Sequence, residues 1–155
     1  MPIHVPMVDV RTIGAGGGSI AKVNDAGLLE VGPHSAGADP GPICYGRGGN
    51  EPTISDANFL LGRLDVTKLK SVSQEVDIEH IRSIFQEKLA DPLNIDAETA
   101  AAAVLQVAIT RMAGATRMVS VSLGEDPRDF SLFAFGGAGP MPVSYTHLTL
   151  PTKNE

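Results

Sequence analysis

The sequence predicts an α/β domain in which a mixed sheet, starting with an antiparallel meander, packs against helices. Three observations lead to this prediction. Short segments rich in β-branched residues near the start of the chain are separated by turn-forming residues. Two longer segments in the second half repeat apolar residues with the period of a helix. A short and almost entirely apolar segment follows them, which is typical of a buried central strand.

The meander is predicted from alternation and turn residues. Residues 8–14 and 19–24 alternate between apolar and polar side chains, and four glycines occur between positions 14 and 18. We expect these glycines to form a hairpin loop between two strands. The sequence NDAG at 24–27 indicates a second turn, and LLEVGP at 28–33 is the third predicted strand.

A long loop and a short helix are predicted next. Residues 33–56 show no periodicity and are rich in glycine and proline, so we expect a long ordered loop. The segment SDANFLLGRL predicts a short helix. Ser55 or Asp56 is expected to cap this helix and Gly62 to end it.

Two longer helices and a strand complete the predicted fold. The first helix spans 77–90, with Asp77 as its N-cap and Pro92 stopping it. The second begins at Asp96 and runs to about Val121, and Gly124 closes it. The predicted apolar faces contain Ile78, Ile81, Phe85 and Leu89 in the first helix, and Val104, Leu105, Ala108, Ile109, Met112, Ala115 and Val119 in the second. FSLFAF at 130–135 is the predicted buried strand, and it leads directly into GGAGP.

Composition excludes several classes of function. Twelve basic and eighteen acidic residues give a net charge of −6, and no basic run is present, so we expect neither nucleic acid nor an anionic membrane as a partner. No apolar run approaches the roughly 20 residues of a membrane span, and the first residues lack the pattern of a secretory signal. The single cysteine, Cys44, excludes an internal disulfide framework. A cytoplasmic protein is therefore expected.

The two glycine turns, at 14–18 and 136–139, each follow a predicted strand. Loops without Cβ atoms allow backbone N–H groups to converge on an anion, most often a phosphate. A purely structural turn is the alternative for either loop alone. The usual nucleotide motifs do not match, because GPICYGRG has Arg47 where a P-loop needs lysine, and Ser19 stands where a dinucleotide fingerprint needs its third glycine.

Four motifs occur in order along the chain: DVRTIGAGGGSIAKV, SAGADPGPICYGRGG, PTISDANFLLGRL and FSLFAFGGAGP. With them the chain closely resembles the hydantoinase A/5-oxoprolinase family, from residue 6 to about residue 142. The resemblance implies a ribonuclease-H-like lobe of the actin-like ATPase superfamily, in which ATP lies between two such lobes. Residues 1–142 would then be a partial hydantoinase A domain, the second nucleotide-binding lobe, and residues 143–155 a non-native tail.

The resemblance also implies roles for individual residues. The expected nucleotide-binding residues are Gly16, Gly17, Gly18, Ser19, Gly136, Gly137, Gly139 and Arg47. The expected catalytic residues are Asp56 and Asp39, and the expected Mg²⁺ residue is Asp9. Simpler roles remain open, since Asp56 could be only a helix cap and Asp39 only a turn residue. Cys44 is expected to be a buried structural thiol.

The family resemblance implies a chemistry for the intact protein. ATP would activate a carbonyl, and hydrolysis of a cyclic amide (5-oxoproline or a hydantoin) or carboxylation of a ketone would follow, with a hydantoinase B-type partner. The first-lobe phosphate motif D-x-G-G-T-x-x-D is absent from this sequence. We therefore expect the isolated chain to bind nucleotide weakly and to be inactive. Another actin-like kinase and a non-catalytic remnant are the competing interpretations.

Overall fold

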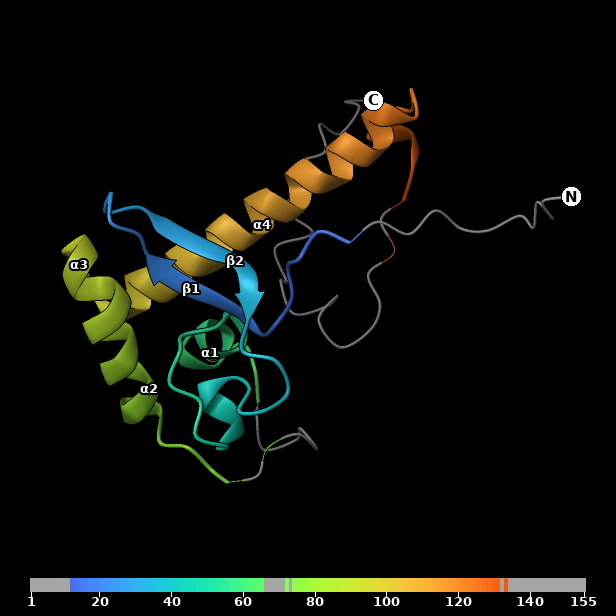
Figure 1. Ribbon diagram of the computed structural model, residues 1–155. Coiled ribbons are helices and arrows are strands. Elements are labelled where there is room, and N and C mark those ends of the chain that lie inside the picture. Colours follow the sequence, from blue (N-terminus) through green and yellow to red (C-terminus); the bar gives the residue numbers. More distant parts are fainter. Residues whose placement is uncertain (1–11, 66–71, 73, 132, 134–155) are drawn as a thin grey trace, which may run out of the picture.

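The structure is a computed structural model, and it describes residues 12–65, 72, 74–131 and 133 (Figure 1). It is an α/β arrangement in which a small antiparallel sheet and several helices enclose one core. The sheet contains β1 (Ser19–Val23) and β2 (Leu29–Ser35). The α-helices are α1 (Ile54–Leu60), α2 (Ile78–Phe85), α3 (Asp91–Leu93) and α4 (Ala97–Ser122). Short 3₁₀ helices η1 (Ile43–Tyr45) and η4 (Pro127–Asp129) and the π-helical turn η3 (Gln86–Ala90) complete the described elements.

The hairpin of β1 and β2 forms where the sequence predicts it. Ala21 pairs with Val31 and Val23 with Leu29, so the two inward-facing residues Ala21 and Val31 reach the core together. The connecting turn is closed by Asn24, whose Oδ1 accepts hydrogen bonds from the N–H groups of Ala26 and Leu28, 3.0 Å each. This confirms the predicted NDAG turn.

The other edge of β1 is occupied by a segment that is distant in sequence. The Ala21 N–H donates to the carbonyl of Pro52 at 2.8 Å, and Ile20 forms an isolated bridge with Thr53. In the predicted three-stranded meander, residues 8–14 would pair with this same edge of β1. Of these, residues 12–14 are described and form no strand, so this part of the prediction is wrong; residues 8–11 lie outside the described residues.

Helix α1 begins one turn earlier than the predicted cap positions imply. Its N-cap is Thr53, whose side chain accepts a hydrogen bond from the Asp56 N–H, while the Asp56 carboxylate accepts from the Thr53 N–H. This is a capping box, so Ser55 and Asp56 lie inside the first turn and neither is the N-cap. Gly62 follows the helix with a φ of +69°, as predicted for its end.

The helical segment after residue 77 begins as predicted and ends later. Asp77 is the N-cap of α2 and accepts a hydrogen bond from the Glu79 N–H. Pro92 was expected to stop the helix, but it lies within α3, directly after the π-helical turn η3. Proline is tolerated there because its missing N–H falls in the first turn of a new helical segment. The segment ends at Asn94, which is left-handed with a φ of 56°.

Helix α4 forms the long axis of the structure (Figure 1). Asp96 caps it, as predicted, by accepting a hydrogen bond from the Thr99 N–H at 2.8 Å. Its first half is buried through Ala97, Ala100, Ala101, Val104, Leu105, Ala108 and Ile109. The predicted apolar face continues to Val119, but Met112, Ala115 and Val119 are only partly buried. The hairpin and the other helices therefore pack mainly on the first half, and in the second half the Arg111 guanidinium donates to the Val31 carbonyl of β2 at 2.6 Å.

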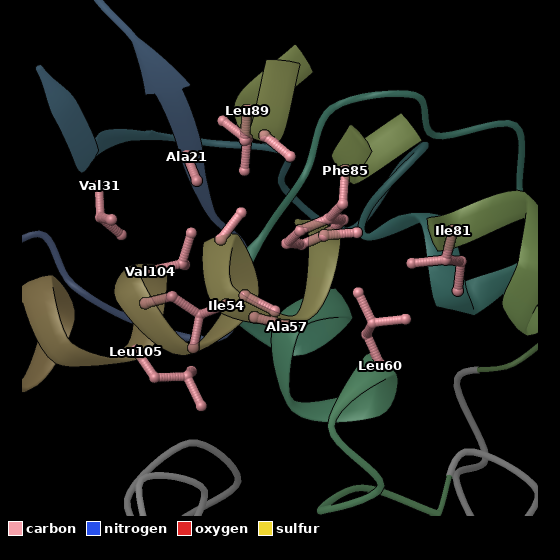
Figure 2. Packing of buried hydrophobic residues seen from close by; sticks show 14 of the residues in the cluster. Ala21, Val31, Ile54, Ala57, Leu60, Ile81, Phe85, Leu89, Val104 and Leu105 are labelled. Atoms are coloured by element: carbon pink, nitrogen blue, oxygen red, sulfur yellow. The ribbon is translucent and has the colours of Figure 1, made fainter. Parts of the chain in front are cut away.

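The core is shared by all the main elements. Figure 2 shows Ala21 and Val31 of the hairpin converging with residues of α1, α2 and α4. The largest fully buried side chain is Phe85, at 0% exposure. The predicted central strand at 130–135 does not join this core in the described part. Phe130 and Phe133 are 58% and 83% exposed, and residues 130, 131 and 133 are not in a strand.

Candidate functional site

The glycine turn, defined as residues 16–19, closes on itself just before β1. The Ser19 N–H donates to the Gly16 carbonyl at 2.9 Å, and the Gly16 N–H donates to Ser19 Oγ at 2.9 Å. Ser19 is buried, whereas the three glycines are partly exposed. The turn is therefore held in one conformation by its own backbone and by the Ser19 hydroxyl.

The carbonyl groups of all three glycines in this turn accept hydrogen bonds from N–H groups of the protein. The Gly17 carbonyl accepts a hydrogen bond from the Ser55 N–H at 2.9 Å, and the Gly18 carbonyl accepts one from the Ala36 N–H at 2.8 Å. Within the described part of the chain, the N–H groups of Gly17 and Gly18 have no such partner. An excess of backbone donors over acceptors is the property that makes a turn attractive to an anion.

Two of these glycines differ in the space around them. A Cβ added at Gly18 would lie 2.9 Å from Ser35 Oγ, so local packing requires glycine there. A Cβ added at Gly16 would meet no atom within 4 Å, and its φ lies outside the left-handed region. Nothing in the described structure therefore requires glycine at position 16, and the space beside it is open.

A second segment, which we call the Arg47 loop (residues 36–50), lies at the same end of the sheet. It starts at the glycine turn, because the Ala36 N–H donates to the Gly18 carbonyl. The Arg47 guanidinium donates from Nη1 to the Ala38 carbonyl at 2.9 Å. This contact places Arg47 next to Asp39, and both side chains are exposed. Hydrogen bonds thus connect the segment that contains Arg47 and Asp39 to the glycine turn.

Asp56, in the first turn of α1, is fully buried. Its Oδ1 accepts a hydrogen bond from the Cys44 N–H at 2.7 Å. Its Oδ2 accepts from the Ile43 N–H at 3.2 Å, and from the N–H and hydroxyl of Thr53 at 3.0 and 2.7 Å. Burial raises the pKa of Asp56, and the hydrogen bonds from Thr53 and Cys44 oppose that shift. All of these contacts are internal, so the geometry favours a structural role, and the catalytic role stays a prediction.

Cys44 is a buried residue with no access to a substrate. Its thiol is 0% exposed, and burial, followed by the charge of Asp56, raises its pKa far above the ordinary value. A thiol is a nucleophile only as the thiolate. Cys44 is therefore a buried structural thiol, as the sequence predicts.

Helix α1 also contributes two buried polar side chains that the sequence does not predict as part of the functional site. Ser55 and Asn58 are buried at 0% and 1% exposure, and Ser55 Oγ and Asn58 Oδ1 have no hydrogen-bond partner among the described residues. Ser55 also holds Gly17 through its backbone N–H. Thr53 was missed as well, although the Thr-x-x-Asp spacing at 53–56 is a recognisable capping-box signal.

Some predicted site residues cannot be placed. Asp9, Gly136, Gly137 and Gly139 lie outside the described residues. Within the described residues, no cluster of three or more His, Cys, Asp or Glu side chains could hold a metal ion. In the same part of the chain, no helix is long and apolar enough to span a membrane.

Comparison with known proteins defines the class to which this fold and turn belong. The Hydantoinase/oxoprolinase family model matches residues 1–151, so the chain is a member of that family. The expected family is thus confirmed, and the match extends beyond the predicted boundary at residue 142.

Particular relatives include amide hydrolases and carboxylases. The chain is 48% identical to caprolactamase subunit alpha of Pseudomonas jessenii, over 91% of this chain and 20% of that protein. It is 42% identical to the acetophenone carboxylase gamma subunit of Aromatoleum aromaticum, over 89% of this chain and 19% of that protein. It is also 37% identical to the 5-oxoprolinase of Saccharomyces cerevisiae, over 88% of this chain and 11% of that protein. The chain therefore spans about one fifth or less of these relatives.

Two solved structures share the fold. The ATP-dependent caprolactamase from Pseudomonas jessenii superposes with a TM-score of 0.84 at 45% identity, over 97% of this chain and 22% of that chain. A nucleotide-free acetone carboxylase superposes with a TM-score of 0.78 at 28% identity, over 90% of this chain and 20% of that chain. The arrangement described above thus recurs within much longer enzymes.

Proposed function

We propose that this chain is the part of an ATP-dependent cyclic-amide hydrolase that holds the phosphates of ATP at the glycine turn. The observation that carries the proposal is the hydrogen bonding of that turn. All three glycine carbonyls accept hydrogen bonds from protein N–H groups, whereas no described residue accepts a hydrogen bond from the backbone N–H of Gly17 or Gly18. A phosphate group has only acceptors to offer, so it complements this turn.

Three further features suit a phosphate at this position. The open space beside Gly16 leaves room for the ligand. Ser19 Oγ already accepts from Gly16 and keeps its own proton for donation to a phosphate oxygen. The exposed guanidinium of Arg47 lies in the loop that starts at the turn, and it adds positive charge to this region.

The substrate class follows from the relatives and not from the site. Bound ATP would supply a phosphoryl group that makes an amide carbonyl reactive. The residues of this chain would bind and orient the phosphates, and Mg²⁺ would accompany the nucleotide, with Asp9 as its proposed ligand through water. A hydantoinase B-type subunit or domain is the proposed partner. Because this chain spans 20% of caprolactamase subunit alpha and 11% of the 5-oxoprolinase, we propose that the isolated chain binds ATP weakly and hydrolyses no amide.

A ketone carboxylase subunit is the second candidate, favoured by the 42% identity to the acetophenone carboxylase gamma subunit. The two candidates differ in what stimulates ATP hydrolysis by the full-length protein. A cyclic-amide hydrolase responds to a lactam alone, whereas a carboxylase requires a ketone together with bicarbonate. If ATP hydrolysis is stimulated only by the ketone together with bicarbonate, the carboxylase is the correct function and the proposed hydrolase is wrong.

Titration of the chain with Mg-ATP, followed by amide hydrogen exchange, tests the phosphate site. We expect slower exchange at residues 16–19, and Gly16→Ala should weaken binding by about tenfold or more because its methyl group occupies the open space. Gly114→Ala is the matched control, because Gly114 also has no atom within 4 Å of an added Cβ and lies in α4. Equal affinities for wild type and Gly16→Ala would mean that the turn is only structural.

A further inference from the structure

Helix α1 connects the two segments of the proposed nucleotide site. Its residue Ser55 holds the glycine turn through the hydrogen bond to the Gly17 carbonyl. Its neighbour Asp56 holds the Arg47 loop through the N–H groups of Ile43 and Cys44. Adjacent residues in one helical turn therefore bind Gly17 and Ile43, which lie 26 positions apart in sequence.

The carboxylate of Asp56 is the centre of this connection. It accepts from the start of η1 and from the capping residue Thr53, so it joins the N-terminal ends of two helical segments. Each recorded contact of its two oxygens is with a donor, and the side chain is fully buried. A neutral amide could not reproduce this pattern, because its NH₂ group would face N–H and O–H donors.

The position of Arg47 depends on this carboxylate through a short path. Ile43 and Cys44 belong to η1, which ends at Tyr45, and Gly46 follows it in the left-handed conformation with a φ of 66°. Residue 46 must be glycine, because an added Cβ would collide with the backbone of Gln74. Only Tyr45 and Gly46 separate Cys44 from Arg47, so the position of η1 determines the position of the Arg47 backbone.

We infer that Asp56 is a positioning residue, which fixes the Arg47 loop relative to the glycine turn so that both contact the same nucleotide. The role of the nucleotide in this inference rests on the proposed function. The linkage between the two segments does not, since it can be measured without any ligand. Asp56 acts through Ile43 and Cys44 and does not itself touch the nucleotide.

Amide hydrogen exchange of the ligand-free chain tests the linkage. In Asp56→Asn, we expect exchange to accelerate about tenfold or more at Ile43 and Cys44, and also at Ser55, whose N–H binds the glycine turn. Asp96→Ala removes the cap of α4 and is the control for a general loss of stability. Acceleration confined to Ile43 and Cys44, or of equal size in Asp96→Ala, would overturn the linkage.

A milder variant keeps the test valid if Asp56→Asn does not fold. Thr53→Val leaves the carboxylate in place and removes the hydroxyl, which donates to Asp56 Oδ2 and caps α1 by accepting from the Asp56 N–H. We expect the same pattern of exchange with a smaller acceleration. Unchanged exchange at Ile43 and Cys44 in this variant would count against the linkage.

A double-mutant cycle with Mg-ATP tests the positioning of Arg47. Arg47→Ala and Asp56→Asn should each weaken binding about tenfold, and the double variant should be no weaker than about tenfold, because both remove the same contact. Arg47→Ala combined with Asp96→Ala should show independent effects. Independent effects of Arg47→Ala and Asp56→Asn would overturn the inference. If the wild-type chain does not bind Mg-ATP, the proposed function fails, and the exchange experiment alone decides on the linkage.

Discussion

Single residues in the 36–50 segment owe their identity to close backbone contacts. A Cβ at Gly49 would collide with the carbonyl oxygen of Gly41, and one at Gly46 would collide with the backbone of Gln74. Gly16 has no such neighbour and does not adopt a left-handed φ. Among the described glycines, Gly46 and Gly49 therefore belong to a group that the fold requires, whereas Gly16 belongs to a group, with Gly114, for which neither φ nor packing requires glycine.

The two groups predict different effects on stability. Gly49→Ala should lower the free energy of unfolding by about 1–3 kcal/mol, because the fixed backbone of Gly41 cannot move away from the added methyl group. Gly16→Ala should change it by less than about 0.5 kcal/mol. Urea unfolding monitored by circular dichroism measures both. A large loss of stability in Gly16→Ala would mean that position 16 is structural after all.

At the scale of elements, the starts of α2 and α4 agree with the sequence prediction, whereas the start of α1 does not. Asp77 and Asp96 cap α2 and α4 at the predicted positions, because a short acidic side chain before an apolar repeat is a local signal. The end of the first of these helical segments was predicted less well. Pro92 lies inside the helical segment. The π-helical turn before it changes the backbone hydrogen-bond pattern just before the position where proline, which has no N–H, enters the helix.

The cap of α4 predicts a dependence of stability on pH. The hydrogen bonds from the Thr99 hydroxyl and N–H lower the pKa of Asp96 below its ordinary value of 3.8. A lowered pKa in the folded state means that the stability from this group is present above pH 3.8 and is lost as the pH falls through the lowered value. Asp96→Ala should therefore be less stable than wild type at pH 7, and the difference should shrink as the pH falls below 3.8.

Thr99→Val is the matched variant for this prediction. It removes the hydroxyl donor to Asp96 and leaves the backbone donor, so the pKa of Asp96 should rise toward its ordinary value. The pH-dependent part of the stability should then be smaller than in wild type, and its loss should be complete at a higher pH. The urea concentration at the midpoint of unfolding, measured between pH 2 and pH 7 for all three proteins, tests this pH dependence. A constant difference between wild type and Asp96→Ala at every pH would contradict the assignment.

At the scale of the whole molecule, the core is built around the first half of α4. Leu105 and Val104 are buried in the shared core, whereas Met118 and Val121 in the second half are 71% and 69% exposed. In Figure 1 the second half of α4 extends beyond the hairpin and the other helices. The stability of the described part is thus concentrated at one end of this helix.

Substitutions along α4 should reflect this division. Leu105→Ala should lower the free energy of unfolding by about 2–5 kcal/mol, since it opens a cavity in the shared core. Met118→Ala should change it by less than about 0.5 kcal/mol, because the side chain has few packing partners to lose. Thermal or urea unfolding of the two variants provides the comparison. Similar losses in both would show that the second half of α4 is packed in solution.

The sequence by itself determined the family, the hairpin with its NDAG turn, the caps of α2 and α4, and the glycine turn as a candidate anion site. These features depend on residues within a few positions of one another. Only the tertiary structure decided that residues 52–53 occupy the edge of β1, that Thr53 caps α1, and that Asp56 joins η1 to that helix. Such contacts join residues that are distant in the chain, and local patterns carry no information about which distant groups will meet when the core forms.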